Sequence, residues 1–308
     1  MISCSKKSVQ WTFQNVSYGP DRNQTFNILI PKERNNVHAI VYIHGGFYYS
    51  GNKLWYPQFL TDFSKNNIFA TIDYRLVAFG DINNNTNMHD MISDVNDALI
   101  KIIDVANENG VSIKDFILVG HSAGAQLGLL YGYKYFKENN NEKINISACI
   151  SLAGPNDYTD DIGWSSMTYH GDSLQKRLLR LSQIGTKLTG HNIELMQSNW
   201  TEQNNYDEFK AYVEDISPIM YVNNTDKFPA TLLVHGKNDS IVPYSNSSRL
   251  NSALDNTSIP HKLITPTGTG DNHMLGGESN MPDSVEPITY RNQPWVNEVR
   301  EWMKEYLK

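Results

Sequence analysis

Short apolar runs alternate with amphipathic segments along most of the 308-residue chain. The central runs are almost continuously apolar, as expected of strands covered on both faces of a parallel sheet. Six such strands are predicted, at residues 37–43, 68–74, 116–119, 146–152, 231–234 and 262–265. Residues 9–18 and 25–30 alternate between polar and apolar side chains, which predicts an antiparallel edge to the same sheet.

The segments between these runs predict helices at residues 55–66, 87–109, 125–136, 244–255 and 294–307. Apolar residues recur at helical spacing in the second of these segments, and Gly110 follows it where a C-terminal cap belongs. The alternation of strands and helices predicts an open α/β sheet. Right-handed crossovers then place the carboxyl ends of the parallel strands on one edge, where such sheets bind ligands.

Residues 154–228 interrupt this alternation, because they contain no clear strand and at least two helical segments, near residues 173–185 and 206–215. A stretch of this length without strands favours an inserted helical cap over a loop. We therefore predict a single domain over residues 1–308 with a cap insertion at about 154–228. Trp164, Tyr169 and Trp200 in the insertion are candidates for a lid over the site.

Composition narrows the choice of partners. The formal charge is −7 and lysine and arginine are scattered, so neither nucleic acid nor an anionic membrane is expected as a partner. No run is long enough to span a bilayer, and the first residues lack an apolar signal core, which predicts a cytoplasmic protein unless a signal peptide has been removed. Cys4 and Cys149 make no disulfide framework. No spacing indicates a metal site or a dinucleotide cofactor, and the oligomeric state stays open.

Residues 120–124 read Gly-His-Ser-Ala-Gly directly after an apolar strand and before a helix. This G-x-S-x-G pattern in that context predicts a nucleophile elbow, a turn too tight for large side chains beside the serine. The turn holds the serine in a strained backbone conformation and projects its hydroxyl above the sheet. Ser122 is therefore the candidate nucleophile.

A serine hydroxyl needs a base to take its proton. In elbow folds the acid and then the histidine follow the serine in the chain. His235 lies upstream of the natural acid, and His261 begins a strand at the wrong edge of the sheet. His273 follows the last strand in a loop able to reach the active edge, so we take His273 as the base.

Asp239 is the leading candidate for the acid, because it lies just beyond the strand at residues 231–234. An ordinary turn aspartate is the alternative reading, since Asp and Asn are common in turns. Asp157 and Asp271 are competing acids, although Asp271 is too close to His273 in sequence to orient its ring easily.

Residues 44–47 read His-Gly-Gly-Phe at the end of the strand at residues 37–43, where an elbow hydrolase carries its oxyanion loop. Glycines let the backbone approach the serine and turn N–H groups toward it. Gly46, Phe47 and Ala123 are the predicted donors to the oxyanion.

Several blocks of the chain resemble the hormone-sensitive-lipase-like carboxylesterases, especially their feruloyl- and acetyl-esterase-like branch. These blocks are His-Gly-Gly-Phe at 44–47, Asp-Tyr-Arg-Leu at 73–76, Gly-His-Ser-Ala-Gly at 120–124, Ser-Pro-Ile at 217–219, and the segment from His235 to Tyr244. The resemblance covers the chain from about residue 18 to its end, without the body of the insertion. It implies an α/β-hydrolase fold, acyl-ester hydrolysis through a covalent acyl-enzyme, no cofactor, and a structural role for Asp73 near His44.

The resulting hypothesis is a serine carboxylesterase acting on small acyl esters. Phe47 stands where lipases carry a third glycine, a feature shared with kynurenine formamidases, so an arylformamidase is the first alternative. A non-catalytic binding module on the same scaffold is the second. Tyr48 and Trp55, with Phe47 and Tyr49, are either the wall of a substrate pocket or packing beneath the cap.

Overall fold

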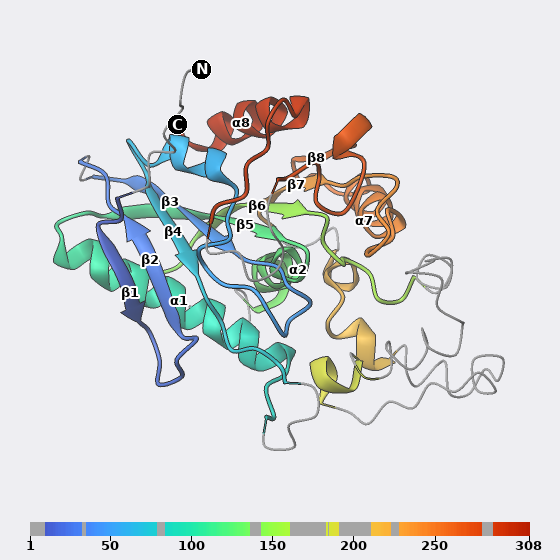
Figure 1. Ribbon diagram of the computed structural model, residues 1–308, viewed down its shortest axis with the longest axis horizontal. Coiled ribbons are helices and arrows are strands. Elements are labelled where there is room, and N and C mark those ends of the chain that lie inside the picture. The colour runs from blue at the N-terminus through green and yellow to red at the C-terminus, as the bar shows by residue number, and fades with distance from the viewer. Residues whose placement is uncertain are drawn as a thin grey trace.

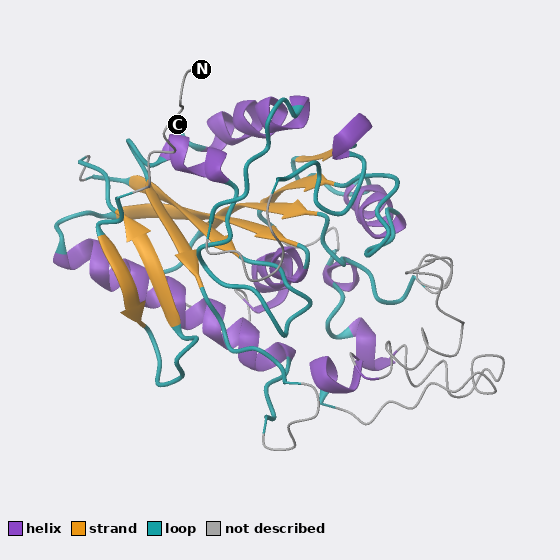
Figure 2. Cartoon of the chain, viewed as in Figure 1, coloured by secondary structure: helices purple, strands orange, loops and turns teal. Residues whose placement is uncertain are grey.

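The computed structural model describes residues 10–32, 35–78, 84–135, 143–160, 183, 185–190, 211–222, 228–278 and 286–308. An eight-stranded sheet runs through the middle of the molecule, with helices on both of its faces (Figures 1 and 2). The strands are β1 (Phe13–Ser17), β2 (Thr25–Leu29), β3 (Val37–Ile43), β4 (Ile68–Ile72), β5 (Ile113–His121), β6 (Ile146–Leu152), β7 (Ala230–Val234) and β8 (His261–Ile264).

The order of strands across the sheet is β1-β2-β4-β3-β5-β6-β7-β8. β1 pairs antiparallel with β2, and β2 pairs antiparallel with β4, while every other pairing is parallel. All eight predicted strands are present, and the polar-apolar alternation of the first two marks the antiparallel edge as expected. This sheet, with helices on both faces, confirms the predicted fold class.

The helices of the described residues divide between the two faces. Those with both ends described are η1 (Gln58–Phe63), α1 (Met88–Glu108), α2 (Ala123–Leu130) with the π-helical turn η2 (Tyr131–Tyr135), η3 (Pro218–Tyr221), α7 (Ser245–Leu254), η4 (Gly268–Gly270) and α8 (Pro294–Tyr306). Buried side chains of α1, α2 and α7 pack on one face of the sheet, and those of η1 and α8 on the other. Figure 1 shows α1 along the lower side of the sheet and α8 above it.

Local sequence explains where the elements begin and end. β3 and β4 are buried along their whole length, which accounts for their continuous apolar runs. The side chain of Asn87 accepts the N–H groups of His89 and Asp90, and the Asn87 N–H in turn donates to the Asp90 carboxylate, so a capping box starts α1. Gly110 follows the helix with φ +71°, a conformation that costs glycine little.

Two helical predictions need correction. The segment 55–66 is a 3₁₀ helix over Gln58–Phe63 only, because Pro57 is extended at its N-cap and forms a bridge to Ile288 instead. The helix predicted at 125–136 starts two residues earlier, at Ala123, and widens into a π-helical turn after Leu130.

Most of the predicted insertion lies outside the described residues, as do Cys4, Trp164, Tyr169 and Trp200. Within the described parts of residues 154–228 the chain forms no strand. The domain boundaries and the cap therefore stay predictions.

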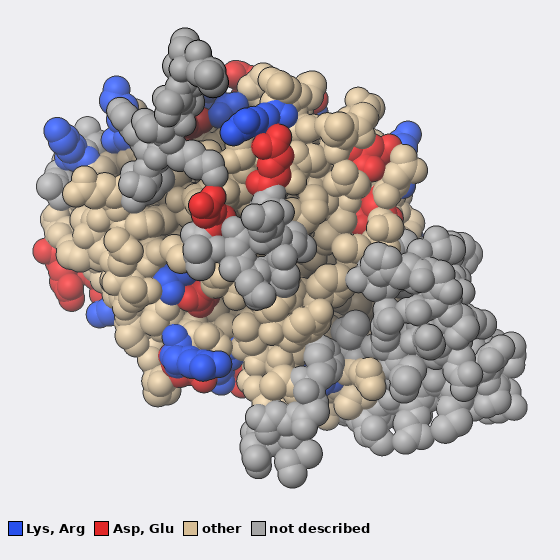
Figure 3. Space-filling view, in the orientation of Figure 1, with Lys and Arg blue, Asp and Glu red and all other residues tan. Residues whose placement is uncertain are grey.

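Charged side chains of both signs are interspersed over the described part of the face in Figure 3, as the scattered lysines and arginines predict. Among the residues that the structure describes, no helix is both long and apolar enough to cross a membrane.

Candidate active site

Ser122 lies in the tight turn between β5 and α2. Its backbone has φ 52° and ψ −122°, a strained conformation for a residue with a side chain. A Cβ on Gly120 would lie 2.2 Å from the carbonyl oxygen of Gly124, and a Cβ on Gly124 would lie 2.2 Å from that of Ile43. Both outer glycines of G-x-S-x-G are therefore required by close backbone approach, and the elbow geometry is as predicted.

The structure brings the three predicted triad residues together. Ser122 Oγ lies 3.0 Å from His273 Nε2, and His273 Nδ1 lies 2.8 Å from Asp239 Oδ2. His273 follows η4 after β8, and Asp239 follows β7, so the loops after two adjacent parallel strands carry the pair. The geometry allows the ring to accept the serine proton while the carboxylate fixes its tautomer.

Asp239 is held by its own turn. Its Oδ1 accepts the N–H groups of Ile241 at 2.8 Å and Val242 at 2.9 Å, which leaves Oδ2 toward His273. Burial raises the pKa of Asp239, but hydrogen bonds from His235 and His273 outweigh burial and lower the pKa below its usual value. The group is therefore a carboxylate at neutral pH.

The two competing acids have other partners. Asp271 accepts the N–H of Asn238 at 2.9 Å and its side-chain amide at 2.7 Å, so it ties the loop of Asp239 to that of His273. Asp157 faces Arg249, whose Nε donates to it at 2.6 Å. Sequence reasoning missed the bridging position of Asp271, because it depends on how two loops meet in space.

His121 precedes the serine and lies beside the base. Its Nε2 is 3.0 Å from the carbonyl oxygen of His273, and the two ring centroids are 5.1 Å apart. Burial, reinforced by the nearby His273 ring, lowers the pKa of His121 to about 3. The ring is thus neutral at pH 7 and donates from Nε2 to that carbonyl.

This shift predicts an acid-sensitive fold. The folded pKa of His121 is about 3 against 6.5 for the free side chain, so the unfolded chain binds more protons between these values. The free energy of unfolding should therefore fall by a few kcal/mol as pH drops from about 6.5 toward 3. Urea denaturation at several pH values in this range measures the free energy of unfolding. This free energy should fall less steeply with decreasing pH in His121→Gln than in the wild type. The same pH dependence in both proteins would contradict the lowered pKa of His121.

The predicted oxyanion loop has an unusual backbone. Gly46, Phe47 and Tyr48 follow one another with φ +118°, +55° and +68°. A Cβ on Gly45 would lie 3.1 Å from the Cβ of Ser122, so the loop passes directly beside the candidate nucleophile. A Cβ at position 45 would also lie 2.8 Å from the His121 carbonyl oxygen, so this approach requires the glycine, as the sequence predicts.

The backbone N–H groups of Gly46, Phe47 and Ala123 donate no hydrogen bond within the part of the chain that the structure describes. Ala123 is also the first residue of α2, where helix N–H groups lack internal partners. These are the three groups predicted as oxyanion donors, and they are available for that task.

Buried polar contacts support the predicted oxyanion loop on the side of Asp73. Asp73 accepts the backbone N–H of Lys53, and Lys53 Nζ donates to the other oxygen of Asp73. His44 Nε2 lies 3.8 Å from Asp73 Oδ1, and Tyr74 donates to the His44 carbonyl at 3.0 Å. Asp73 therefore lies where the resemblance implied a structural role, and Lys53 is a partner that sequence reasoning missed.

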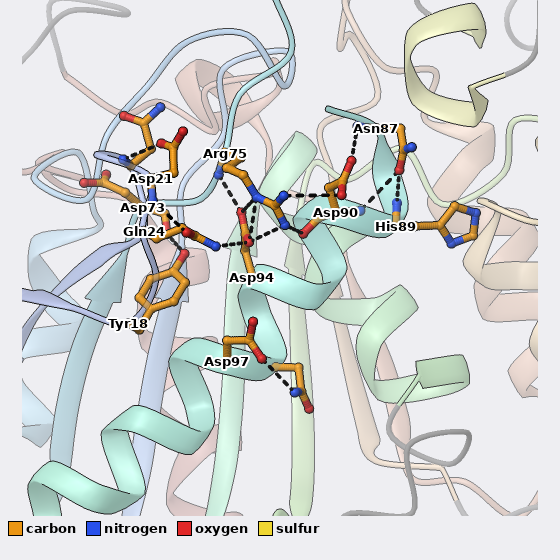
Figure 4. A network of polar contacts seen from close by, with 12 residues as sticks. Tyr18, Asp21, Gln24, Asp73, Arg75, Asn87, His89, Asp90, Asp94 and Asp97 are labelled. Atoms are coloured by element: carbon orange, nitrogen blue, oxygen red, sulfur yellow. Dashed lines mark hydrogen bonds and ion pairs between the residues drawn. The ribbon is translucent and has the colours of Figure 1, made fainter. Parts of the chain in front are cut away.

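A second network fixes the segment that carries Asp73 (Figure 4). Asp94 in α1 accepts the Gln24 amide at 2.7 Å, the Arg75 backbone N–H at 2.7 Å and the Arg75 guanidinium at 2.8 Å. Tyr18 donates to the Asp73 carbonyl at 2.6 Å. The aspartate-tyrosine-arginine block thus links α1 to the predicted oxyanion loop.

The two predicted pocket residues lie inside the protein. Tyr48 is 4% exposed, and its hydroxyl bonds to Gln126 and, at 2.8 Å, to Tyr158. Trp55 is 1% exposed and packs its edge against His121, with ring centroids 5.4 Å apart. These contacts favour packing over a pocket wall. Among the described residues no group of His, Cys, Asp and Glu is arranged to hold a metal ion.

Comparison with known proteins gives a family match over well over half of the chain. The family model described as BD-FAE matches residues 26–254, which include Ser122 and Asp239. A probable isoprenylcysteine alpha-carbonyl methylesterase of Oryza sativa subsp. japonica is 22% identical over 271 residues, covering 83% of this chain and 56% of that protein. The chain thus spans a little over half the length of this curated relative.

Solved structures share the architecture. Esterase B from Lactobacillus rhamnosis has a TM-score of 0.64 at 17% identity, covering 97% of this chain and 84% of that one. A thermophilic esterase from the Planctomycetes species Thermogutta terrifontis has a TM-score of 0.61 at 18% identity, covering 92% and 86%. At these identities the likeness shows the fold, and it agrees with an α/β-hydrolase.

Proposed function

The chain belongs to the BD-FAE family, and from this premise we propose that it is a serine carboxylesterase that hydrolyses small acyl esters. The observation that carries the proposal is the continuous contact from Ser122 Oγ through His273 to Asp239, with distances of 3.0 and 2.8 Å. The names of the relatives described above, a methylesterase and two esterases, support the same reaction class.

In this reaction Ser122 Oγ attacks the ester carbonyl while His273 Nε2 takes its proton. The N–H groups of Gly46, Phe47 and Ala123 stabilise the negative oxygen of the tetrahedral intermediate. His273 returns the proton to the leaving alcohol, and an acyl group stays on Ser122. A water molecule then attacks the acyl-enzyme by the same steps, which releases the acid and restores the serine.

A substrate panel tests the proposal. We expect turnover of p-nitrophenyl acetate and butyrate, with kcat/KM falling as the acyl chain lengthens to decanoate. N-formylkynurenine, measured beside them, should be a poorer substrate. Efficient cleavage of the formamide without ester turnover would indicate an arylformamidase, and a folded protein that cleaves neither would indicate a binding module.

A further inference from the structure

Asp239 is contacted by two histidines. His273 Nδ1 lies 2.8 Å from Oδ2, and His235 Nε2 lies 3.1 Å from the same oxygen. The side chains of His235 and Asp239 are both 0% exposed. The proposed reaction uses His273 and gives no task to His235, although this second ring is buried against the acid.

Contacts beyond His235 define where its proton lies. Ser247 in α7 places its Oγ 2.7 Å from His235 Nδ1 and accepts the Asn156 amide at 3.2 Å. Asn156 in turn accepts the Ser151 hydroxyl at 3.4 Å. The Ser247 hydroxyl still has a proton to donate, and His235 Nδ1 is the acceptor beside it. The proton of the ring therefore lies on Nε2, which faces two acceptors, the Val242 carbonyl oxygen and Asp239 Oδ2, each at 3.1 Å.

The ring is also fixed by its other neighbours. His235 Nε2 lies 3.1 Å from the Val242 carbonyl oxygen, and Tyr244 packs edge-on with ring centroids 5.9 Å apart. A ring held at both nitrogens and on its face has a single orientation, so its Nε2–H points in a fixed direction.

We propose that His235 is a positioning residue for the triad: its Nε2–H, shared between the Val242 carbonyl and Asp239, holds Oδ2 toward His273. Two backbone N–H groups fix Oδ1 of this carboxylate, and His235 supplies the matching constraint on Oδ2. The expected effect of His235 on kcat rests on the proposed function. If the Asp239 carboxylate were misdirected, the His273 ring could turn away from Ser122.

Two variants separate donation from packing. His235→Gln places an amide N–H close to the position of Nε2, whereas His235→Leu fills the space without a donor. We expect His235→Leu to lower kcat about 10- to 100-fold with KM within about threefold, and His235→Gln to recover most of the loss.

The matched control is His261→Leu. It removes a histidine that is paired with Asp255 at 3.0 Å at the opposite end of β8, and it should leave kcat unchanged. Wild-type kcat in His235→Leu, beside an inactive Ser122→Ala, would overturn the inference while sparing the proposed function.

A second measurement does not depend on turnover. Long-range ¹H–¹⁵N spectra of histidine-labelled protein should show His235 as the neutral Nε2–H tautomer at pH 7. The Nδ1–H signal of His273 should shift in His235→Leu and stay near its wild-type position in His235→Gln. A protonated His235 ring, or its Nδ1–H tautomer, would overturn the inference even if the protein cleaves no ester. Should His235→Leu fail to fold, Ser247→Ala removes the donor to Nδ1 and should produce a mixture of His235 tautomers.

Discussion

Ser122→Ala should lower kcat for p-nitrophenyl butyrate by about 10⁴-fold or more while KM changes little. The expectation follows from the contact of Ser122 Oγ with His273 Nε2 at 3.0 Å, because without this oxygen no covalent acyl-enzyme forms. Alanine fits the space of the turn, although it keeps the strained φ of 52°. Stopped assays at high enzyme concentration can measure the residual rate.

Ser252→Ala is the matched control for this experiment. Ser252 is an exposed serine on α7 whose hydroxyl contacts only the Ser248 carbonyl among the described residues. Its replacement should leave kcat within about twofold, since surface substitutions away from special features have small effects. A Ser122→Ala protein with activity near that of the control would refute the assignment of the nucleophile.

Asp239→Asn should have the second largest effect, a loss of about 10⁴-fold in kcat. Oδ1 of Asp239 accepts two backbone N–H groups, and Oδ2 faces His235 and His273. An asparagine has one carbonyl oxygen, so its NH₂ group meets donors on one of these sides. If the NH₂ group faces His273 Nδ1, the ring takes the wrong tautomer and Nε2 can no longer accept the serine proton.

Asp271→Asn provides the comparison, because Asp271 was a candidate for the same role. It contacts Asn238 at 2.9 and 2.7 Å, and no contact joins its carboxylate to the His273 ring in the described structure. We expect kcat of this variant to stay within about tenfold of wild type. A larger loss of kcat in Asp271→Asn than in Asp239→Asn would indicate that Asp271 is the acid instead.

Sequence reasoning brought Ser122, Asp239 and His273 to one edge of the sheet, where the structure also has them, because their placement follows from topology. Once β7 and β8 are parallel neighbours, residues just beyond their ends share one edge with Ser122. The same reasoning placed the candidate oxyanion loop at the end of β3. The buried strands could also be predicted from the sequence, because a strand that is covered on both faces has a nearly continuous apolar run.

Other features were not readable from the sequence. The segment 55–66 has helix-like periodicity, but Pro57 and its bridge to Ile288 extend its first residues, and the partner is far away in the chain. Lys53 and His235 depend on side-chain directions at the meeting of distant loops. Trp55 illustrates the same difficulty. An aromatic residue near a site can line a pocket or pack in the core beside it. For Trp55 the contact with His121 favours packing, and the sequence does not show this contact.

The proposed triad is spread widely along the chain, since His273 lies 151 positions after Ser122 and 34 positions after Asp239. During synthesis the serine, its elbow and the oxyanion loop leave the ribosome long before the base does. A nascent chain that ends before β8 thus has the candidate nucleophile but lacks its proposed base. If the proposed triad acts, hydrolysis can begin only after β8 has paired and the loop beyond it has brought His273 to Ser122, so the onset of ester turnover would report the assembly of this edge of the sheet.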